Sequence, residues 1–419
     1  MATDTSSPET RAKYKGGPLW KPWMEEVRLW QATSIEEVED FFERNDQKKI
    51  ISWDVETDSL DPRCERVCGH CFAFDETEGM YVPTKHKNHP EMNVDSEKMW
   101  VILRRELEKR VLVVYNYMYE GRVLKSLGWK RPVTTDHLLD GLIYRWMYDT
   151  DEMKINLKDA AEELLGKQML EIKEVPGIMQ GKLLDFSRTS PEDATLYAAA
   201  DPVMALGVIA KTKPIVDKEQ GFIVKLEHQV LGTLLSMQDN PVTMDRAFLK
   251  QAEKDLLHWI DVVTLKCFEL AGFEFKIGSS KEVGKVLQGV GIKLKETEKG
   301  NLKTGAEEIE KLAGEHPIVD WILLHRALVK ERSTYVQTPL EHTTDENPKA
   351  VFKMTSTGAP TGRFSGGGTD DLDPLFMPMN PQAIPSASKY EPARCREVKN
   401  PPSELMREVS GSPDMGVDE

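Results

Sequence analysis

The sequence predicts an α/β fold, in which helices pack against a sheet, followed by a mainly helical region. Apolar runs typical of strands are concentrated in residues 50–115, and helical patterns follow them. One acidic residue returns on a late helix, a pattern typical of a sheet with helices against it. From residue 222 onward the apolar spacing is that of helices. We therefore expect an α/β domain first and a helical domain after it.

Composition is ordinary for a globular protein and limits how the chain can bind nucleic acid. Its 419 residues, 40% hydrophobic and 30% charged, are enough for two to four domains. The formal charge is −15, from 55 basic and 70 acidic residues, so binding DNA would need a local basic surface. We expect the polar N-terminus not to be a signal peptide, and we expect no run to approach the length of a membrane span. Five unevenly spaced cysteines favour a reducing cytoplasm.

Capping and apolar spacing locate the elements of the α/β region. Ser34 opens a capping box before a helix over residues 35–44, and the spacing of residues 96–109 predicts another helix. Ser190 and Pro191 begin a later helix with a capping serine and a first-turn proline. Residues 1–16 are expected to be disordered, and residues 17–31, rich in tryptophan, to pack as an ordered extension. We expect a first strand that begins at residue 50 and carries Asp54 and Glu56, further strands over residues 67–73, 80–83 and 111–115, and further helices over 136–146 and 157–165.

Two carboxylates on one predicted strand form the first candidate metal site. Asp54 and Glu56 are two residues apart, so a strand directs both to the same face. Two acids this close repel each other unless a cation lies between them, and Mg²⁺ and Mn²⁺ prefer oxygen ligands. On its own the pattern more often marks a hairpin edge with two solvated acids.

Two later segments make the metal site the better interpretation. Asn116, Tyr119 and Glu120 follow an apolar run and supply a third acid near a strand-to-helix junction. Tyr197 and Asp201 are four residues apart and so share one helix face. The acidic pair, then N-x-x-Y-acid, then Y-x-x-x-D, in this order, is a far more specific signal than any single part.

This order of motifs resembles the proofreading 3′–5′ exonuclease domain of family A DNA polymerases, the four-carboxylate class with a tyrosine in its third motif. The resemblance implies a ribonuclease-H-like fold, a mixed sheet with flanking helices, that hydrolyses the 3′ ends of single-stranded DNA with two divalent ions, Mg²⁺ or Mn²⁺. Asp54 would contact both ions, Glu56 and Asp201 would complete the first, and Glu120 would help to hold the second.

The resemblance also assigns roles around the metal site, with one departure from the family pattern. Tyr197 would orient the attacking water, and Asn116 and Tyr119 would bind the substrate strand. The second motif of the family normally ends in aspartate, whereas this chain has Glu120. Whether the longer side chain supports full activity stays open at this point.

Beyond the exonuclease region the resemblance continues into the polymerase thumb and the first palm strands. Residues 272–280, 304–305, 326–330 and 334–335 match the thumb, where a basic loop would grip phosphates. Residues 355–365 and 380–385 match the first palm strands, in which Arg363 and Gln382 would contact the minor groove at the primer end. The lysines of the basic loop are Lys293, Lys295, Lys299 and Lys303.

These matches give the expected domain boundaries. Residues 1–45 form a partly disordered extension, 46–215 the exonuclease domain, 216–350 the helical thumb, 351–388 the first palm strands and 389–419 a loose tail. The helix that carries Asp201 is expected to end near residues 213–214.

A cysteine cluster offers a competing interpretation. Cys64, Cys68 and Cys71 have the C-x3-C-x2-C spacing of enzymes that hold an iron–sulfur cluster. A regular strand would direct Cys68 and Cys71 to opposite faces, so the thiolates would not converge. The same objection applies to a zinc site that uses His70. We expect these cysteines to behave as small core hydrophobes.

The resemblance further implies what polymerisation would require. The two palm aspartates and the fingers helix of the family have no counterpart here, and the acidic residues of the Gly-rich loop are expected to be solvated. Polymerase activity would then need a partner chain that carries palm and fingers. A stand-alone exonuclease and a DNA-binding module with an impaired nuclease site are the alternatives. The expected source is a bacteriophage, and the expected location is the cytoplasm of its bacterial host. The loop residues concerned are Asp370, Asp371 and Asp373.

Overall fold

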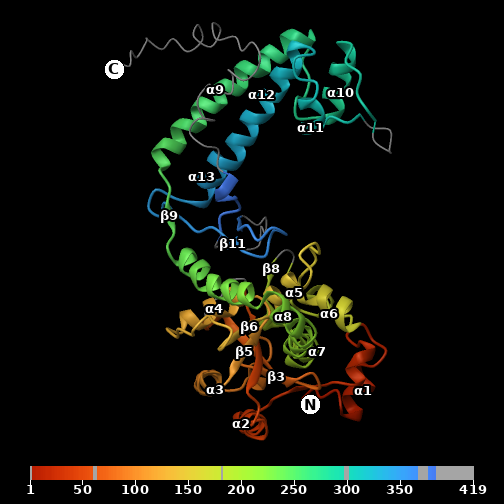
Figure 1. Cartoon of the computed structure of the whole chain (residues 1–419), viewed down its shortest axis with the longest axis vertical. Helices are drawn as coiled ribbons and strands as arrows, with labels where there is room; N and C mark the ends of the chain where they lie inside the picture. Colours follow the sequence, from red (N-terminus) through yellow and green to blue (C-terminus); the bar gives the residue numbers. More distant parts are fainter. Residues whose placement is uncertain (1, 60–63, 181–182, 297–301, 367–375, 384–419) are drawn as a thin grey trace. The chain divides into compact units, whose positions relative to one another are not determined.

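The computed structural model describes residues 2–59, 64–180, 183–296, 302–366 and 376–383. The chain divides into two compact units, one of Met1–Pro241 with Lys353–Phe376 and one of Val242–Phe352 with Met377–Glu419. Figure 1 shows the elements of both units coloured along the sequence. The candidate site lies in the first unit.

A six-stranded mixed sheet organises the first unit, with the strand order β1-β4-β3-β2-β5-β6. The central strands β2, β3 and β4 form an antiparallel meander, while β1 runs parallel to β4, and β5 and β6 continue parallel to β2. The prediction of an α/β fold with a mixed sheet is therefore confirmed. The strands are β1 (Arg28–Gln31), β2 (Ile50–Thr57), β3 (Val67–Asp75), β4 (Glu78–Pro83), β5 (Val111–Val114) and β6 (Leu138–Asp140).

Helices cover both faces of this sheet. One buried cluster joins α2, α3, α4 and α5 to the face that carries Trp53 and Phe72, and a second joins α6, α7 and the start of α8 to the opposite face. Because side chains alternate along a strand, Asp54 and Glu56 point toward the second of these faces. The helices are α1 (Pro8–Tyr14), α2 (Ile35–Arg44), α3 (Ser96–Lys109), α4 (Tyr117–Ser126), α5 (Gly141–Tyr148), α6 (Leu157–Leu165), α7 (Pro191–Ala198) and α8 (Ala200–Asp239).

A β-bulge in the central hairpin corrects the expectation for the cysteines. Asp54 pairs with Cys71 and Glu56 with Gly69, but Thr57 pairs with Val67, so Cys68 is an extra residue on its strand. The bulge reverses the alternation, and both cysteines are fully buried in the same apolar cluster. Cys68 Sγ donates a hydrogen bond to the backbone oxygen of Glu56 at 3.4 Å.

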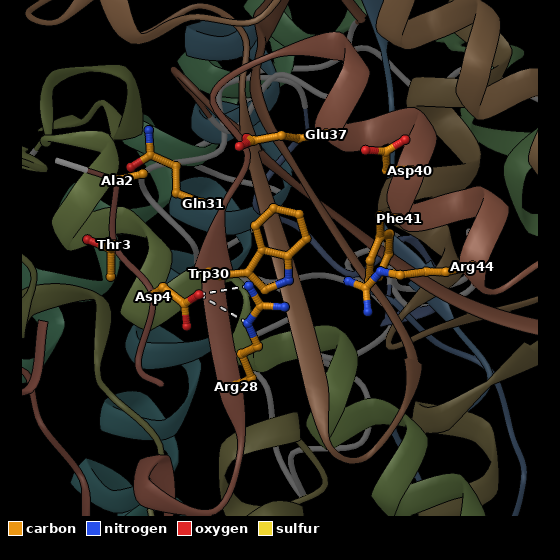
Figure 2. A pocket seen from close by; sticks show the side chains of 10 residues that line it. All are labelled: Ala2, Thr3, Asp4, Arg28, Trp30, Gln31, Glu37, Asp40, Phe41 and Arg44. Atoms are coloured by element: carbon orange, nitrogen blue, oxygen red, sulfur yellow. Dashed lines mark hydrogen bonds and ion pairs between the residues drawn. The ribbon is translucent and has the colours of Figure 1, made fainter. Parts of the chain in front are cut away.

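The N-terminal residues are ordered against the sheet and are not disordered as the sequence predicted. Thr5 Oγ1 donates a hydrogen bond to Val27 O and accepts one from Leu29 N, both at 2.8 Å. Tyr14 at the end of α1 donates one to Asp193 at 2.7 Å. Residues 2–4, β1 and α2 line a cavity of about 460 Å³, in which Arg28 and Arg44 lie against the ring of Trp30 (Figure 2).

Two helix boundaries differ from the prediction. The expected helix over residues 136–146 is a short strand, β6, followed by α5, because the buried Asp140 ends the strand and caps the helix through Leu142 N at 2.9 Å. The helix that carries Asp201 does not end near Pro214: it passes through Pro214 as far as a kink at Gln220, where the dihedrals are non-helical, and a second helical stretch continues from there to Asp239. Apolar residues on both sides of Pro214 are buried in the core, which holds the helix together across the proline.

The second unit is built from helices. α9 (Arg246–Ala271) and α12 (Pro317–Glu331) lie side by side (Figure 1) and share a buried cluster with α10 (Ser280–Gly289) and α11 (Ala306–Glu310). A π-helical stretch, Arg332–Gln337, leads from α12 into α13 (Thr338–His342). β9 (Val242–Thr243) pairs antiparallel with β10 (Lys349–Ala350).

The segment expected to form palm strands is only partly described. Within this segment, β11 (Met354–Thr355) pairs antiparallel with β12 (Ser365–Gly366). Another short antiparallel pair, β7 (Met179–Gln180) with β8 (Leu183–Leu184), belongs to the first unit. The expected tail, the acidic loop residues 370, 371 and 373, and Lys299 lie outside the described residues. Lys293, Lys295 and Lys303 are described, and all three are exposed.

The expectation that no run approaches the length of a membrane span needs a correction: among the described residues, the stretch Pro191–Asp239 is long and apolar enough by composition to cross a membrane. It contains α7 and α8, and 78% of its most apolar window is buried inside the fold. Burial of this kind is typical of a core helix, so the stretch gives only weak evidence for a membrane span.

Candidate active site

Four carboxylates from three parts of the fold meet beside β2. Asp54 and Glu56 come from the strand itself, Glu120 from the first turn of α4, and Asp201 from the first turn of α8. The Glu120 carboxyl donates a hydrogen bond to that of Asp54. The structure therefore brings together all four acids that the sequence analysis assigned to the site.

The crowding of these acids raises their pKa values. Burial raises the pKa of Asp54 to about 7, although hydrogen bonds from Glu120 and the Val55 backbone oppose the shift. Burial, and then the charge of Asp54, raise the pKa values of Glu56, Glu120 and Asp201 well above the ordinary range for carboxyls. Asp54 is thus the centre of the cluster, because its charge acts on all three of the others.

Two carboxylate oxygens in the cluster have no partner. Among the residues that the structure describes, Glu120 Oε2 and Asp201 Oδ1 are buried and find no hydrogen-bond partner. Leaving a buried charged oxygen unpaired is costly, and a divalent cation removes that cost while also relieving the repulsion. The residues present therefore fit a hard divalent metal ion such as Mg²⁺ or Mn²⁺.

Tyr197, at the end of α7, lies over the same cluster. Only 9% of it is exposed, and burial together with the charges of Asp201, Glu56 and Asp54 raises its pKa well above the usual value. Its hydroxyl therefore stays protonated at neutral pH. The sequence predicted one helix for Tyr197 and Asp201, and the structure has two, α7 and α8, that join through Ala199 in a helical conformation.

The two residues expected to bind substrate differ in their surroundings. The Tyr119 hydroxyl is hydrogen-bonded to Thr57 Oγ1 at 2.6 Å, at the end of β2. Asn116 is exposed, with φ of 84°, and precedes α4 without capping it through its side chain. Both residues lie close before Glu120 in the chain. Within the described part of the chain, a hydrogen bond links Tyr119, and none links Asn116, to the strand that carries Asp54 and Glu56.

Asp140, rather than Asn116, caps the start of α4 with its side chain. This buried carboxylate accepts hydrogen bonds from the backbone N–H groups of Asn116 at 2.9 Å and Tyr117 at 2.8 Å, and so fixes the start of α4. Asp136, the first residue of the helix expected over residues 136–146, is exposed. An aspartate directly before a glycine and a helical pattern was the available signal for Asp140, as an N-cap of α5.

Lys158, on α6, is a second residue that the sequence analysis did not place in the site. Its Nζ lies 4.7 Å from the ring centroid of Tyr197, and its charge lowers the pKa values of Glu56 and Asp201. It also forms an ion pair with Glu171 at 3.5 Å. No local pattern predicts this role, because Lys158 reaches the cluster only through the packing of α6 against α8.

The two expected primer-end residues are both exposed and belong to separate units. Arg363 lies in the first unit and Gln382 in the second. Their expected role in the minor groove stays a prediction.

Two protein families match separate stretches of this chain. Residues 31–217 match the 3′–5′ exonuclease family, and residues 246–393 match DNA polymerase family A. The chain carries a 3′–5′ exonuclease domain and the start of a family A DNA polymerase domain. The carboxylate cluster and Tyr197 all lie within the part of the chain that matches the exonuclease family.

Bacterial DNA polymerases I are similar over most of this chain. The enzyme of Borreliella burgdorferi is 25% identical over 347 residues, which cover 81% of this chain and 37% of that protein. The enzyme of Synechocystis is 26% identical over 339 residues, or 78% of this chain and 34% of that protein. The chain thus spans about a third of the length of these relatives.

A solved structure supports the fold. The polymerase domain of Pol1 from M. smegmatis, in complex with DNA primer-template and dNTP, matches with a TM-score of 0.60 at 16% sequence identity. The match covers 85% of this chain and 56% of that one. The ribonuclease-H-like fold expected for the exonuclease region fits the mixed sheet with its flanking helices.

Proposed function

We propose that this protein is a metal-dependent exonuclease that removes nucleotides from the 3′ end of single-stranded DNA. The observation that carries the proposal is the cluster of Asp54, Glu56, Glu120 and Asp201, with buried oxygens of Glu120 and Asp201 left without a partner. The match of residues 31–217 to the 3′–5′ exonuclease family supports the same reaction.

Divalent ions bound in the cluster would neutralise the carboxylates and lower the pKa of a bound water. Asp54 would be a ligand of two ions, because its charge interacts with the other three acids. Glu56 and Asp201 would complete the ligands of the first ion and Glu120 those of the second.

The remaining residues would position the substrate strand and the water. Tyr197 keeps its proton at neutral pH and can donate it in a hydrogen bond while accepting one from water. Tyr119, fixed through Thr57, would support the terminal nucleotide, and the exposed Asn116 would contact the strand beside it. The product of each step would be a nucleoside monophosphate.

The direct test is product analysis on a single-stranded oligonucleotide labelled at its 5′ end. With Mg²⁺ the protein should shorten the labelled strand one nucleotide at a time and release nucleoside monophosphates. A strand whose 3′ end carries a phosphorothioate linkage should be degraded more slowly. Internal fragments without stepwise shortening, or no products at all, would contradict the proposal.

We further propose that residues 246–393 act in polymerisation together with family A palm and fingers segments on a partner chain. The observation that favours this second function is the match of residues 246–393 to DNA polymerase family A. The exposed Arg363 and Gln382 would contact the minor groove of the primer terminus. The exposed lysines at 293, 295 and 303 would grip the duplex backbone through phosphate contacts.

Primer extension separates this second function from its alternatives. The 419-residue protein alone should degrade a primed template without adding nucleotides, and a polypeptide carrying family A palm and fingers should restore synthesis. Degradation without restored synthesis would favour a stand-alone exonuclease. DNA binding without any degradation would favour a binding module with an impaired nuclease site, and synthesis by this chain alone would refute the need for a partner.

A further inference from the structure

A cysteine thiol lies among the carboxylates of the candidate site. Cys71 is the residue of β3 that pairs directly with Asp54 on β2. The Sγ atom of Cys71 and a carboxylate oxygen each of Asp54 and Glu56 all lie within 4.8 Å of one another. The thiol is fully buried and faces the same side of the sheet as the two acids.

The three ligand atoms are placed well enough to share one ion. Zinc-to-ligand bonds of about 2.0–2.3 Å put two ligands of the same ion about 3–4 Å apart, so small side-chain rotations close the set. A thiolate is a soft ligand that favours Zn²⁺ and similar ions over Mg²⁺. Beside this group, Asp201 Oδ1 is buried and has no hydrogen-bond partner among the described residues, which is a second sign that a cation fits this site.

We propose that Cys71 gives this site a second metal-binding mode, in which a thiophilic ion such as Zn²⁺ or Cd²⁺ is held by Asp54, Glu56 and the Cys71 thiolate. The thiol releases its proton to solvent as the sulfur–metal bond forms. The ion occupies the place that a hard ion needs for catalysis, so it inhibits the exonuclease. The inhibition depends on the proposed function, whereas the binding mode does not.

The neighbouring cysteine provides a matched control. Cys68 is equally buried, three residues earlier on the same strand, but it bonds to the backbone oxygen of Glu56 and lies outside the group of three ligands. Replacing Cys68 by serine should therefore change packing to a similar extent without removing a metal ligand. This comparison separates loss of a ligand from general damage to the core.

Cadmium titration gives a readout that does not need activity. In full-length protein with Cys64→Ser and Cys395→Ser, Cd²⁺ should produce an ultraviolet sulfur-to-metal absorption band at one ion per chain. The band should persist in Cys68→Ser and disappear in Cys71→Ser, with Cd²⁺ affinity reduced at least tenfold by calorimetry. Circular dichroism should show all variants folded. A band that survives in Cys71→Ser, or no band in the parent protein, would overturn the proposal.

An activity measurement separates this proposal from the proposed function. In Mg²⁺ the Zn²⁺ concentration that halves degradation should rise at least tenfold in Cys71→Ser and stay unchanged in Cys68→Ser. If the Cd²⁺ band depends on Cys71 but no variant degrades DNA, the binding mode stands and the exonuclease proposal fails. If DNA is degraded but Zn²⁺ inhibits all variants equally, the exonuclease proposal stands and the inhibitory mode fails.

Discussion

Glu120 is the residue at which this chain departs from the family pattern, and its surroundings indicate that the longer side chain is accommodated. Its carboxyl reaches Asp54 in a direct hydrogen bond, and its second oxygen is buried with no hydrogen-bond partner in the described part of the chain. An added methylene moves a carboxylate by about 1 Å, enough to cost on the order of a hundredfold in rate if the site had not adjusted.

We therefore predict that Glu120→Asp changes the exonuclease rate by less than about tenfold in either direction. Glu120→Gln, which keeps the shape and removes the charge, should lower the rate by about a hundredfold. Single-turnover degradation of a labelled strand in saturating Mg²⁺ measures both variants. A rise of two or more orders of magnitude in Glu120→Asp would show that the natural site is impaired and would favour the DNA-binding module.

Lys158 tests the electrostatics of the cluster. Its charge offsets the mutual repulsion of Glu56 and Asp201. Lys158→Met should therefore lower the metal-free melting temperature at pH 8 by about 2–4 °C, and Mg²⁺ should restore most of the loss. Lys158→Arg keeps the charge and should stay close to the parent. Equal melting temperatures for all three proteins would mean that Lys158 does not act on the site.

At the residue scale, the sequence predicted those site residues whose position depends on spacing along a single strand or helix. The pair Asp54 and Glu56 follows from strand alternation, and Tyr197 and Asp201 from helical spacing. Cys71 and Lys158 could not be placed in the same way. Cys71 reaches the site through strand register, and Lys158 through the packing of one helix on another.

At the scale of elements, the start of α4 positions Glu120, and Asp140 holds that start in place. Asp140→Asn replaces one acceptor oxygen by an N–H₂ group that faces backbone donors. We predict a loss of about 1–3 kcal/mol of unfolding free energy, measured by urea denaturation, together with a lower exonuclease rate. The exposed Asp136→Asn should change neither quantity. A fully stable and fully active Asp140→Asn protein would contradict this role.

Element boundaries were predicted less well than element types. Proline was expected to end the helix that carries Asp201, but burial on both sides of Pro214 lets this helix continue past the proline to the kink at Gln220. The bulge at Cys68 likewise cannot be predicted from alternation, because an inserted residue is visible only in the pairing of both strands. In both cases long-range packing decides what local preference leaves open.

At the scale of the whole molecule, the burial and mutual repulsion of the four carboxyls make the free energy of unfolding depend on pH and on bound metal. Unfolded carboxyls have pKa values near 4, while the folded, metal-free protein has a pKa of about 7 at Asp54 and raised pKa values at its neighbours. The native state then binds more protons in this window. The free energy of unfolding therefore falls as the pH rises from about 4 to 7.

Divalent ions should cancel this loss, because they bind the ionised carboxylates. We predict that Mg²⁺ raises the melting temperature by several degrees at pH 8 and by less at pH 5, where protons compete for the site. Differential scanning calorimetry measures both shifts. An Asp54→Asn/Asp201→Asn protein should be more stable than the parent without metal at pH 8 and should not respond to Mg²⁺. Equal shifts at the two pH values in the parent would argue against a carboxylate site.

The division into an α/β unit and a helical unit could be predicted from composition and periodicity alone. The course of the chain between them could not, since residues 353–376 return to the first unit after the helices of the second. A return of this kind depends on contacts between segments that are more than a hundred residues apart. The expected boundaries at residues 215 and 350 stay predictions for the functional domains.

The central claim is that Asp54 and Glu56 belong to a nuclease metal site, and one measurement tests it most directly. The parent protein and an Asp54→Ala/Glu56→Ala protein should be incubated with a 5′-labelled single strand in Mg²⁺, with circular dichroism to confirm that both are folded. We predict stepwise shortening from the 3′ end by the parent and a rate at least about a thousandfold lower for the double variant. Degradation by the folded double variant at the rate of the parent would contradict the account.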